Sequence, residues 1–191
     1  MGIRVVPQKE ILKKRYKKLK IDRKFILAGL ILLILSFFID VKKFVFIGLF
    51  MIANALLLSL DRYLNMPVDI EFSTFAAILV TRVYGLNWGI FTAISTKVAA
   101  MLYNANIRAD HFFMIGGYCM AAFITSMFPG VGIVNIGLIA TIIVNIYIYF
   151  VSKYITNLYP FEILMYGASN IIFNMVLFIA FSEPFLSLMS F

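Results

Sequence analysis

Residues 69–104 read DIEFSTFAAILVTRVYGLNWGIFTAISTKVAAMLYN, and this stretch decides the fold. Two apolar segments meet at a turn around Gly85, so the pattern predicts a hairpin of two helices. Three ionisable residues, Glu71, Arg82 and Lys97, interrupt the apolar pattern. A charged side chain inside a membrane span is costly, and it usually has a partner or faces a cavity. The stretch therefore predicts a membrane bundle built around a hairpin with a polar interior.

The composition extends this prediction to the rest of the chain. The 191 residues are 63% hydrophobic with a mean hydropathy of +0.98, whereas a soluble domain is about half apolar. Because one span needs about 20 apolar residues, we expect an all-α, polytopic transmembrane helix bundle of six to seven spans. Residues 25–191 are then a single transmembrane domain, with six spans if the first segment does not cross. The predicted spans are residues 25–39, 44–60, 70–84, 88–103, 112–128, 131–158 and 161–181.

The positive charge is confined to the start of the chain. Residues 1–24 contain ten Lys and Arg against two acidic residues, and the remainder is balanced. This pattern predicts a basic amphipathic tail on the cytoplasmic face of the cell membrane, bound to anionic lipid. A disordered retention tail is the alternative, and nucleic acid is not an expected partner. No small-residue cleavage site follows residues 25–39, so we expect this segment to remain as an anchor.

The hairpin makes a specific pairing testable. Folding at Gly85 places Lys97 opposite Phe75, from where its long side chain reaches toward Glu71. We therefore predict a Glu71–Lys97 pair. The alternative is that Glu71 and Arg82, both near span ends, reach water separately. Lys97 lies deeper in its segment and needs a partner or a cavity under either interpretation.

Two further groups of polar residues are candidate binding elements. The loop of residues 104–111 is rich in polar side chains. One interpretation is that these side chains recognise a polar ligand, and the alternative is that they are only solvated. Two later spans carry polar residues at helical spacing, which predicts faces that meet as interhelical contacts or line a ligand cavity. The first face holds Thr141, Asn145, Tyr149 and Lys153, and the second Tyr166, Asn170 and Asn174. The predicted substrate-binding residues are Glu71, Lys97, Asn104, Asn106, Asn145, Tyr149, Tyr166, Asn170 and Asn174.

Enzyme signatures are missing from the sequence. It contains no H-E-x-x-H, C-x-x-C, G-x-S-x-G or P-loop motif. The single His gives no metal-ligand set, and Cys119 has no second cysteine with which to form an internal disulfide. We therefore expect no enzymatic activity, no catalytic residues, no metal and no cofactor. Active transport would need a separate ATPase chain, and an enzyme acting on lipid lacks its motif.

The hairpin resembles the substrate-binding S-components of energy-coupling-factor (ECF) transporters, and the patterning is also similar to that of MreD-type cell-shape membrane proteins. The residues that carry the resemblance are Pro67-Val68-Asp69, the apolar segment to Val80, and Tyr84-Gly85-Leu86-Asn87-Trp88-Gly89. The S-component resemblance implies a six-helix bundle that binds a vitamin or similar small molecule for uptake. Its partners would be a transmembrane coupling protein and two ATPase subunits. Its pocket would be lined by Asn104, Asn106, Asn145, Tyr166 and Asn170. The MreD-like alternative implies a non-enzymatic scaffold or assembly subunit whose polar residues bind other proteins.

Overall fold

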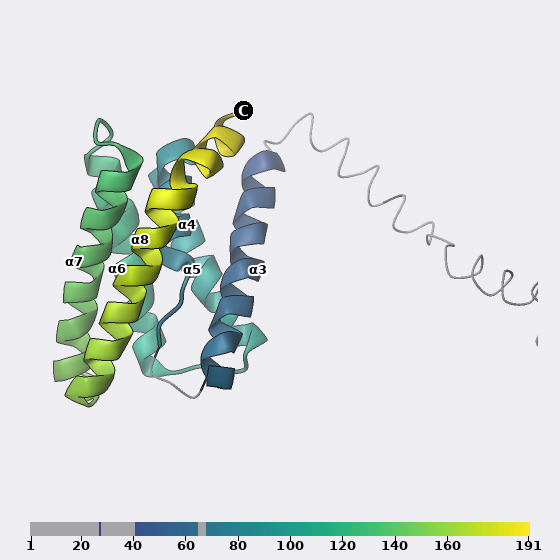
Figure 1. Cartoon of the computed structure of the whole chain (residues 1–191). Helices are drawn as coiled ribbons and strands as arrows, with labels where there is room; N and C mark the ends of the chain where they lie inside the picture. Colours follow the sequence, from purple (N-terminus) through teal and green to yellow (C-terminus); the bar gives the residue numbers. More distant parts are fainter. Residues whose placement is uncertain (1–26, 28–40, 65–67) are drawn as a thin grey trace, which may run out of the picture. The chain divides into compact units, whose positions relative to one another are not determined.

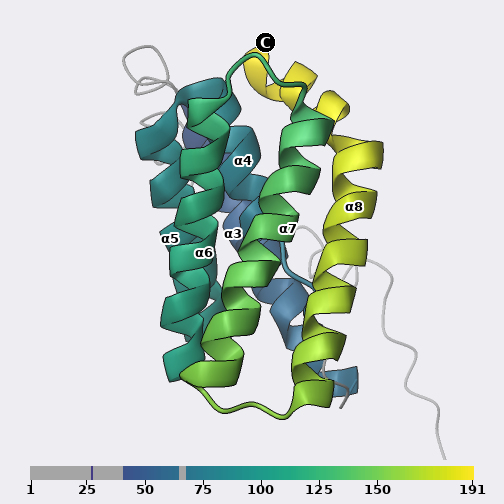
Figure 2. The same ribbon diagram turned by 90° about the vertical axis from the view of Figure 1, so that its left-hand side faces the viewer.

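Six helices make up the part of the chain that the structure describes. This computed structural model describes Leu27 and residues 41–64 and 68–191, with side chains in the ranges 41–59 and 68–191. Figures 1 and 2 show the helices of residues 42–191 arranged as a bundle. No strand occurs in these residues, so the all-α prediction is confirmed there. The helices are α3 (Val41–Leu64), α4 (Ser73–Tyr84), α5 (Leu86–Tyr103), α6 (Ala109–Met127), α7 (Ile133–Tyr154) and α8 (Pro160–Ser190).

The predicted basic tail and first span fall outside this description. Residues 1–24 and, apart from Leu27, residues 25–39 are not among the described residues. The tail, the choice between six and seven spans and the orientation of the bundle therefore stay predictions.

Helix α4 is the core of the bundle. It packs against α5, α6, α7 and α8, and every residue from Ser73 to Thr81 is buried. With 12 residues it is about 18 Å long, which is shorter than a hydrocarbon core of about 30 Å. Helix α4 is therefore shorter than the span predicted over residues 70–84, and it is not among the described helices that are long enough to cross a membrane. An apolar segment of this length is satisfied by burial among other helices, and hydrophobicity alone does not distinguish that environment from lipid.

Small residues let the helices approach one another closely. Gly85 has a φ of 91°, a conformation that favours glycine, and it alone separates α4 from α5. A Cβ at Gly89 would overlap the side chain of Thr81, and one at Gly137 would overlap the ring of Phe178. Helix α5 therefore lies directly on α4 at Gly89.

An aromatic cluster and the amide of Asn54 hold helix α3 against the bundle. The ring of Phe50 lies 6.1 Å from that of Phe72 and 6.4 Å from that of Phe75, measured between centroids. The side chain of Asn54 accepts a 2.7 Å hydrogen bond from the Phe72 backbone and donates a 3.0 Å bond to Ser73 Oγ. These contacts fix α3 against the segment that leads into α4.

Three described helices are long and apolar enough, by length and composition, to cross a membrane. They are α3 over Val41–Ser59, α7 and α8, which is fewer than the six to seven predicted. Large apolar side chains remain exposed on all three, and a soluble surface rarely carries so many together. Examples on these helices are Leu49, Ile52, Ile142, Ile146, Phe150, Leu164, Ile172 and Ile179. These surfaces are compatible with contact with lipid.

The ends of the last two helices differ from the predicted ends. Helix α7 stops at Tyr154, short of the expected Leu158, and α8 continues through Pro184 to Ser190. Proline disfavours a helix interior but does not forbid it. The final turns of α8 are held by the core, because Met189 is buried and its carbonyl accepts a 3.1 Å hydrogen bond from the Tyr84 hydroxyl.

Candidate functional site

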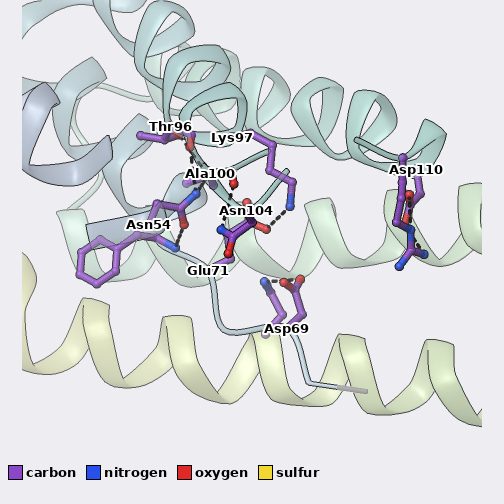
Figure 3. A network of polar contacts seen from close by, with 12 residues as sticks. Asn54, Asp69, Glu71, Thr96, Lys97, Ala100, Asn104 and Asp110 are labelled. Carbon is purple, nitrogen blue, oxygen red and sulfur yellow. Dashed lines mark hydrogen bonds and ion pairs between the residues drawn. The ribbon is translucent and has the colours of Figure 1, made fainter. Parts of the chain in front are cut away.

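A buried ion pair lies at the centre of the candidate site. Lys97 Nζ, from α5, is 2.7 Å from Glu71 Oε2, and each side chain is only 1% exposed. Figure 3 shows Lys97 extending from its helix to the carboxylate of Glu71. Removing each ion from water costs several kcal/mol, so neither charge is stable there without its partner. The predicted Glu71–Lys97 pair is confirmed, and Glu71 does not reach water alone.

The alternative that Glu71 and Arg82 reach water separately needs correction. Glu71 precedes α4, in the irregular segment of residues 68–72, and is buried. The Arg82 guanidinium donates hydrogen bonds to the backbone carbonyls of Pro129 and Val131. It therefore fastens the loop between α6 and α7 instead of extending freely into water.

The ion pair leaves polar atoms unsatisfied around it. Glu71 Oε1 has no hydrogen-bond partner, and neither has the buried Nδ1 of His111. The fully buried Tyr118 hydroxyl approaches the Glu71 carboxylate without a hydrogen bond of ordinary geometry, and its ring centroid is 5.9 Å from Lys97 Nζ. Buried polar atoms without partners are rare and call for a water or a ligand.

Lys97 also lines a small cavity, which we call the polar cavity. Its volume is about 70 Å³, which is room for a few water molecules or one compact polar group. The cavity lies where α6 begins, α7 ends and α8 begins. Its polar lining residues are Asp69, Lys97, Arg108, Asp110, His111, Ser152 and Tyr166.

Part of the predicted polar loop, residues 104–111, lines this cavity. Arg108 Nη2 lies 2.8 Å from Asp110 Oδ2 in a partly exposed ion pair. Asp110 and His111 belong to the first turns of α6 rather than to a loop. Asn104 and Asn106 line neither this cavity nor the groove described next. Asn104 instead donates hydrogen bonds to the backbone carbonyls of α3 and of its own helix.

A second and larger cavity runs between α7 and α8, and we call it the α7–α8 groove. Its volume is about 700 Å³ and its walls are mostly aliphatic. Three of the predicted residues, Asn145, Tyr149 and Tyr166, line it. The groove adjoins the polar cavity, because four residues line both: Asp69, Ile148, Ser152 and Tyr166.

A network of amides crosses from α7 to α8 beside the groove. Asn145 Nδ2 donates to Asn170 Oδ1 at 2.9 Å, and Asn174 Nδ2 donates to the same oxygen at 3.2 Å. Asn170 in turn donates a 2.9 Å bond to Asp69 Oδ2. The two predicted polar faces therefore meet. Asn170 and Asn174 are buried. Asn170 joins the two helices, Asn174 bonds to Asn170 within α8, and Asn145 also faces the groove.

Sequence reasoning missed Asn54, Asp69 and Ser152 as parts of this region. Asn54 is fully buried and donates a 3.2 Å hydrogen bond to the Thr96 carbonyl, one residue before Lys97. Figure 3 shows Asn54 and Asp69 in the same polar region as the ion pair. A single amide inside the apolar segment 44–60 was the available signal for Asn54. Nothing in the local pattern marks Ser152 as a cavity residue.

The candidate site places hydrogen-bonding groups next to apolar surface. Among the described residues no group of three or more His, Cys, Asp and Glu side chains is placed to hold a metal ion. Lys97 offers a cationic donor at the wall of a polar cavity, and an apolar groove begins beside it. No family model, no curated protein and no solved structure matches this chain. The resemblance to S-components and to MreD-type proteins therefore stays a prediction.

Proposed function

We propose that this protein is a multi-pass membrane protein that binds a small molecule at the polar cavity and the adjoining α7–α8 groove. In this proposal it is the substrate-binding subunit of an uptake system. One observation carries the proposal: Lys97 is held by the buried Glu71 and at the same time lines the polar cavity.

A purely structural role explains this arrangement less well. Replacing a buried ion pair with apolar residues is often neutral or stabilising, so such a pair is weak evidence for a stabilising role. Lys97 Nζ carries three donor hydrogens, and its described hydrogen bond to Glu71 uses one. The unpartnered Nδ1 of His111, which lines the same cavity, is a second group available to a ligand.

Uptake would require other chains. No ATP-binding motif occurs in the sequence, so the proposed partners are a transmembrane coupling protein and ATPase subunits, as the S-component resemblance implies. The bundle would lie in the cell membrane with its basic tail in the cytoplasm. The three long apolar helices support the membrane location.

Native mass spectrometry of the protein, extracted gently from its own membrane, tests the proposal. We expect a bound small molecule in the wild type and its loss in Ser152→Leu, because Ser152 lines both cavities. Ser126→Leu is the matched control, since Ser126 is on α6 and hydrogen bonds only to its own helix. A ligand that persists in Ser152→Leu would show that the site is elsewhere.

A scaffold or assembly role is the second candidate, and a different observation favours it. A groove of about 400 Å³ between α3 and α5 has almost purely apolar walls, formed by Gly48, Met51, Ile52, Ala55, Leu56, Ala99 and Tyr103. Such a surface suits the helix of another membrane protein. Gly48 has open space where its Cβ would be, so Gly48→Phe fills this groove. Protein partners that are lost in Gly48→Phe, with no small molecule bound in the wild type, would favour the scaffold.

A further inference from the structure

We infer that the ligand is an amphiphile with one acyl chain and a compact acidic head. The head, a carboxylate or a phosphate, binds at Lys97 and His111 in the polar cavity, and the chain lies in the α7–α8 groove. This inference rests on the proposed function and names the class of ligand that the site takes.

The sizes of the two cavities point to this division. Pockets for whole small molecules usually measure about 300–1,000 Å³, whereas the polar cavity measures about 70 Å³. It therefore accommodates a head group but not a complete vitamin-sized solute. The groove, at about 700 Å³, is in the range for the remainder of a ligand.

Residues that combine a polar group with apolar surroundings lie where the two cavities join. Ser152 and Tyr166 line both spaces, and each presents a hydroxyl next to apolar surface. Polar lining is concentrated on the side of Lys97, and aliphatic lining on the side of Ile142 and Ile171. A molecule that occupies both spaces must be polar at one end and apolar at the other.

Within the polar cavity, Lys97 is the group that would bind an acidic head. Arg108 and Asp110 pair with each other at the rim, and Asp69 accepts the amide of Asn170. The ammonium of Lys97 is buried, and an acidic oxygen beside it would form a short, charge-assisted hydrogen bond. His111, which is only 5% exposed and has no partner at Nδ1, lies at the same cavity as a further hydrogen-bonding group.

The position of the groove explains how an acyl chain would enter. Its walls belong to α7 and α8, two of the three helices that are long and apolar enough to span a membrane. Ile142, Ile146 and Leu164 line the groove and are also strongly exposed. In a bilayer this face meets hydrocarbon, so a chain passes sideways from the membrane into the groove without crossing water.

Photocrosslinking of the full chain in nanodiscs of zwitterionic lipid tests the inference. The probe is palmitic acid with a diazirine in its chain. We expect saturable labelling on the groove residues Ile146, Tyr149 and Ile171. Palmitate should compete with the probe at least tenfold better than hexadecanol, which lacks the acidic head. Competition by lysophosphatidic acid as well would identify a phosphate head as acceptable, whereas competition by palmitate alone would identify a carboxylate.

One residue of the groove allows a matched pair of variants. The missing side chain of Gly167 leaves open space, with Asn145 Oδ1 3.8 Å from the position of a Cβ, so Gly167→Trp fills the groove. We expect it to reduce labelling at least tenfold. Val176→Trp is the control, because nine residues make about two and a half helical turns and place Val176 on the opposite face of α8. Ala168→Trp, also in the groove, replaces Gly167→Trp if that variant does not fold.

Two results would overturn the inference. Labelling that spreads evenly over the exposed faces of α3, α7 and α8 and does not saturate would show only contact with bulk lipid. A water-soluble ligand that is lost in Ser152→Leu but retained in Gly167→Trp would refute the amphiphile and leave the proposed function standing. A ligand retained in both variants would refute both.

Discussion

The two ends of the bundle accommodate a basic residue in different ways. Near the end where α5 is followed by α6, Lys97 is paired with Glu71, and acceptor atoms around the pair remain unsatisfied. At the other end, Arg82 binds two backbone carbonyls of the loop between α6 and α7. The guanidinium of Arg82 closes a loop, whereas the ammonium of Lys97 faces a cavity. The Nε of Arg82 is also without a hydrogen-bond partner, so an unsatisfied polar atom does not by itself separate the two residues. What separates them is the cavity that Lys97 lines, and we infer that a charge in an apolar segment indicates a binding site only where it also lines a cavity.

The largest expected effect comes from breaking the pair at Lys97. Lys97→Met leaves the carboxylate of Glu71 buried and alone, which should lower the free energy of unfolding by about 3–5 kcal/mol. Thermal or denaturant unfolding in detergent measures this loss. The double variant Glu71→Leu, Lys97→Met removes both charges and should recover most of the stability. A double variant as unstable as Lys97→Met alone would show that the charge of Glu71 is not the cause.

Arg82 sharpens the comparison from the other end. Arg82→Met removes a half-buried cation together with its two hydrogen bonds to backbone carbonyls. We expect a loss of about 1–3 kcal/mol in the free energy of unfolding. Ligand binding should not change, because Arg82 lines neither the polar cavity nor the α7–α8 groove. Arg82→Lys keeps the charge but cannot reproduce the two-pronged geometry, so it should be intermediate. Altered binding in a stably folded Arg82→Met protein would remove the distinction between the two ends.

The amide network between α7 and α8 should contribute less. Asn170→Leu removes the bond to Asp69 and the acceptor for Asn145, and interhelical hydrogen bonds of this kind are worth about 0.6–2 kcal/mol. We expect the free energy of unfolding of the variant to be lower than that of the wild type by an amount in this range. Ligand binding should also be weaker, because Asp69 loses a hydrogen-bond partner at the junction of the two cavities. Asn106→Leu, at a residue that lines neither cavity, is the control for binding. Equal binding by the two variants would assign Asn170 to helix packing alone.

The sequence predicted the elements of this fold better than their environments. The Glu71–Lys97 pair was predictable because a turn at Gly85 brings the two segments together. The burial of α4 was not, because its run of Ala, Ile, Leu and Val is equally suited to lipid and to a protein interior. The adjacent cavities depend on where α7 ends and α8 begins, and that geometry comes from packing between distant segments. The error at Asn104 was of the opposite kind. Asn104 was predicted to bind a ligand, but its side chain holds α3 against α5.

The smallest expected effect lies at the rim of the polar cavity, where Arg108 and Asp110 form an exposed counterpart to the buried pair. Arg108→Gln should lower the free energy of unfolding by less than about 1 kcal/mol, because solvent screens exposed pairs. Its effect should be on ligand capture: slower association of an acidic ligand at low salt, with the difference from wild type vanishing as salt is raised. Stopped-flow association across a salt series measures this. A charge at the rim acts on the ligand over a distance, whereas Lys97 acts by contact. A loss of affinity in Arg108→Gln that does not depend on salt would therefore place Arg108 in direct contact with the ligand. The two ion pairs would then be parts of one binding surface.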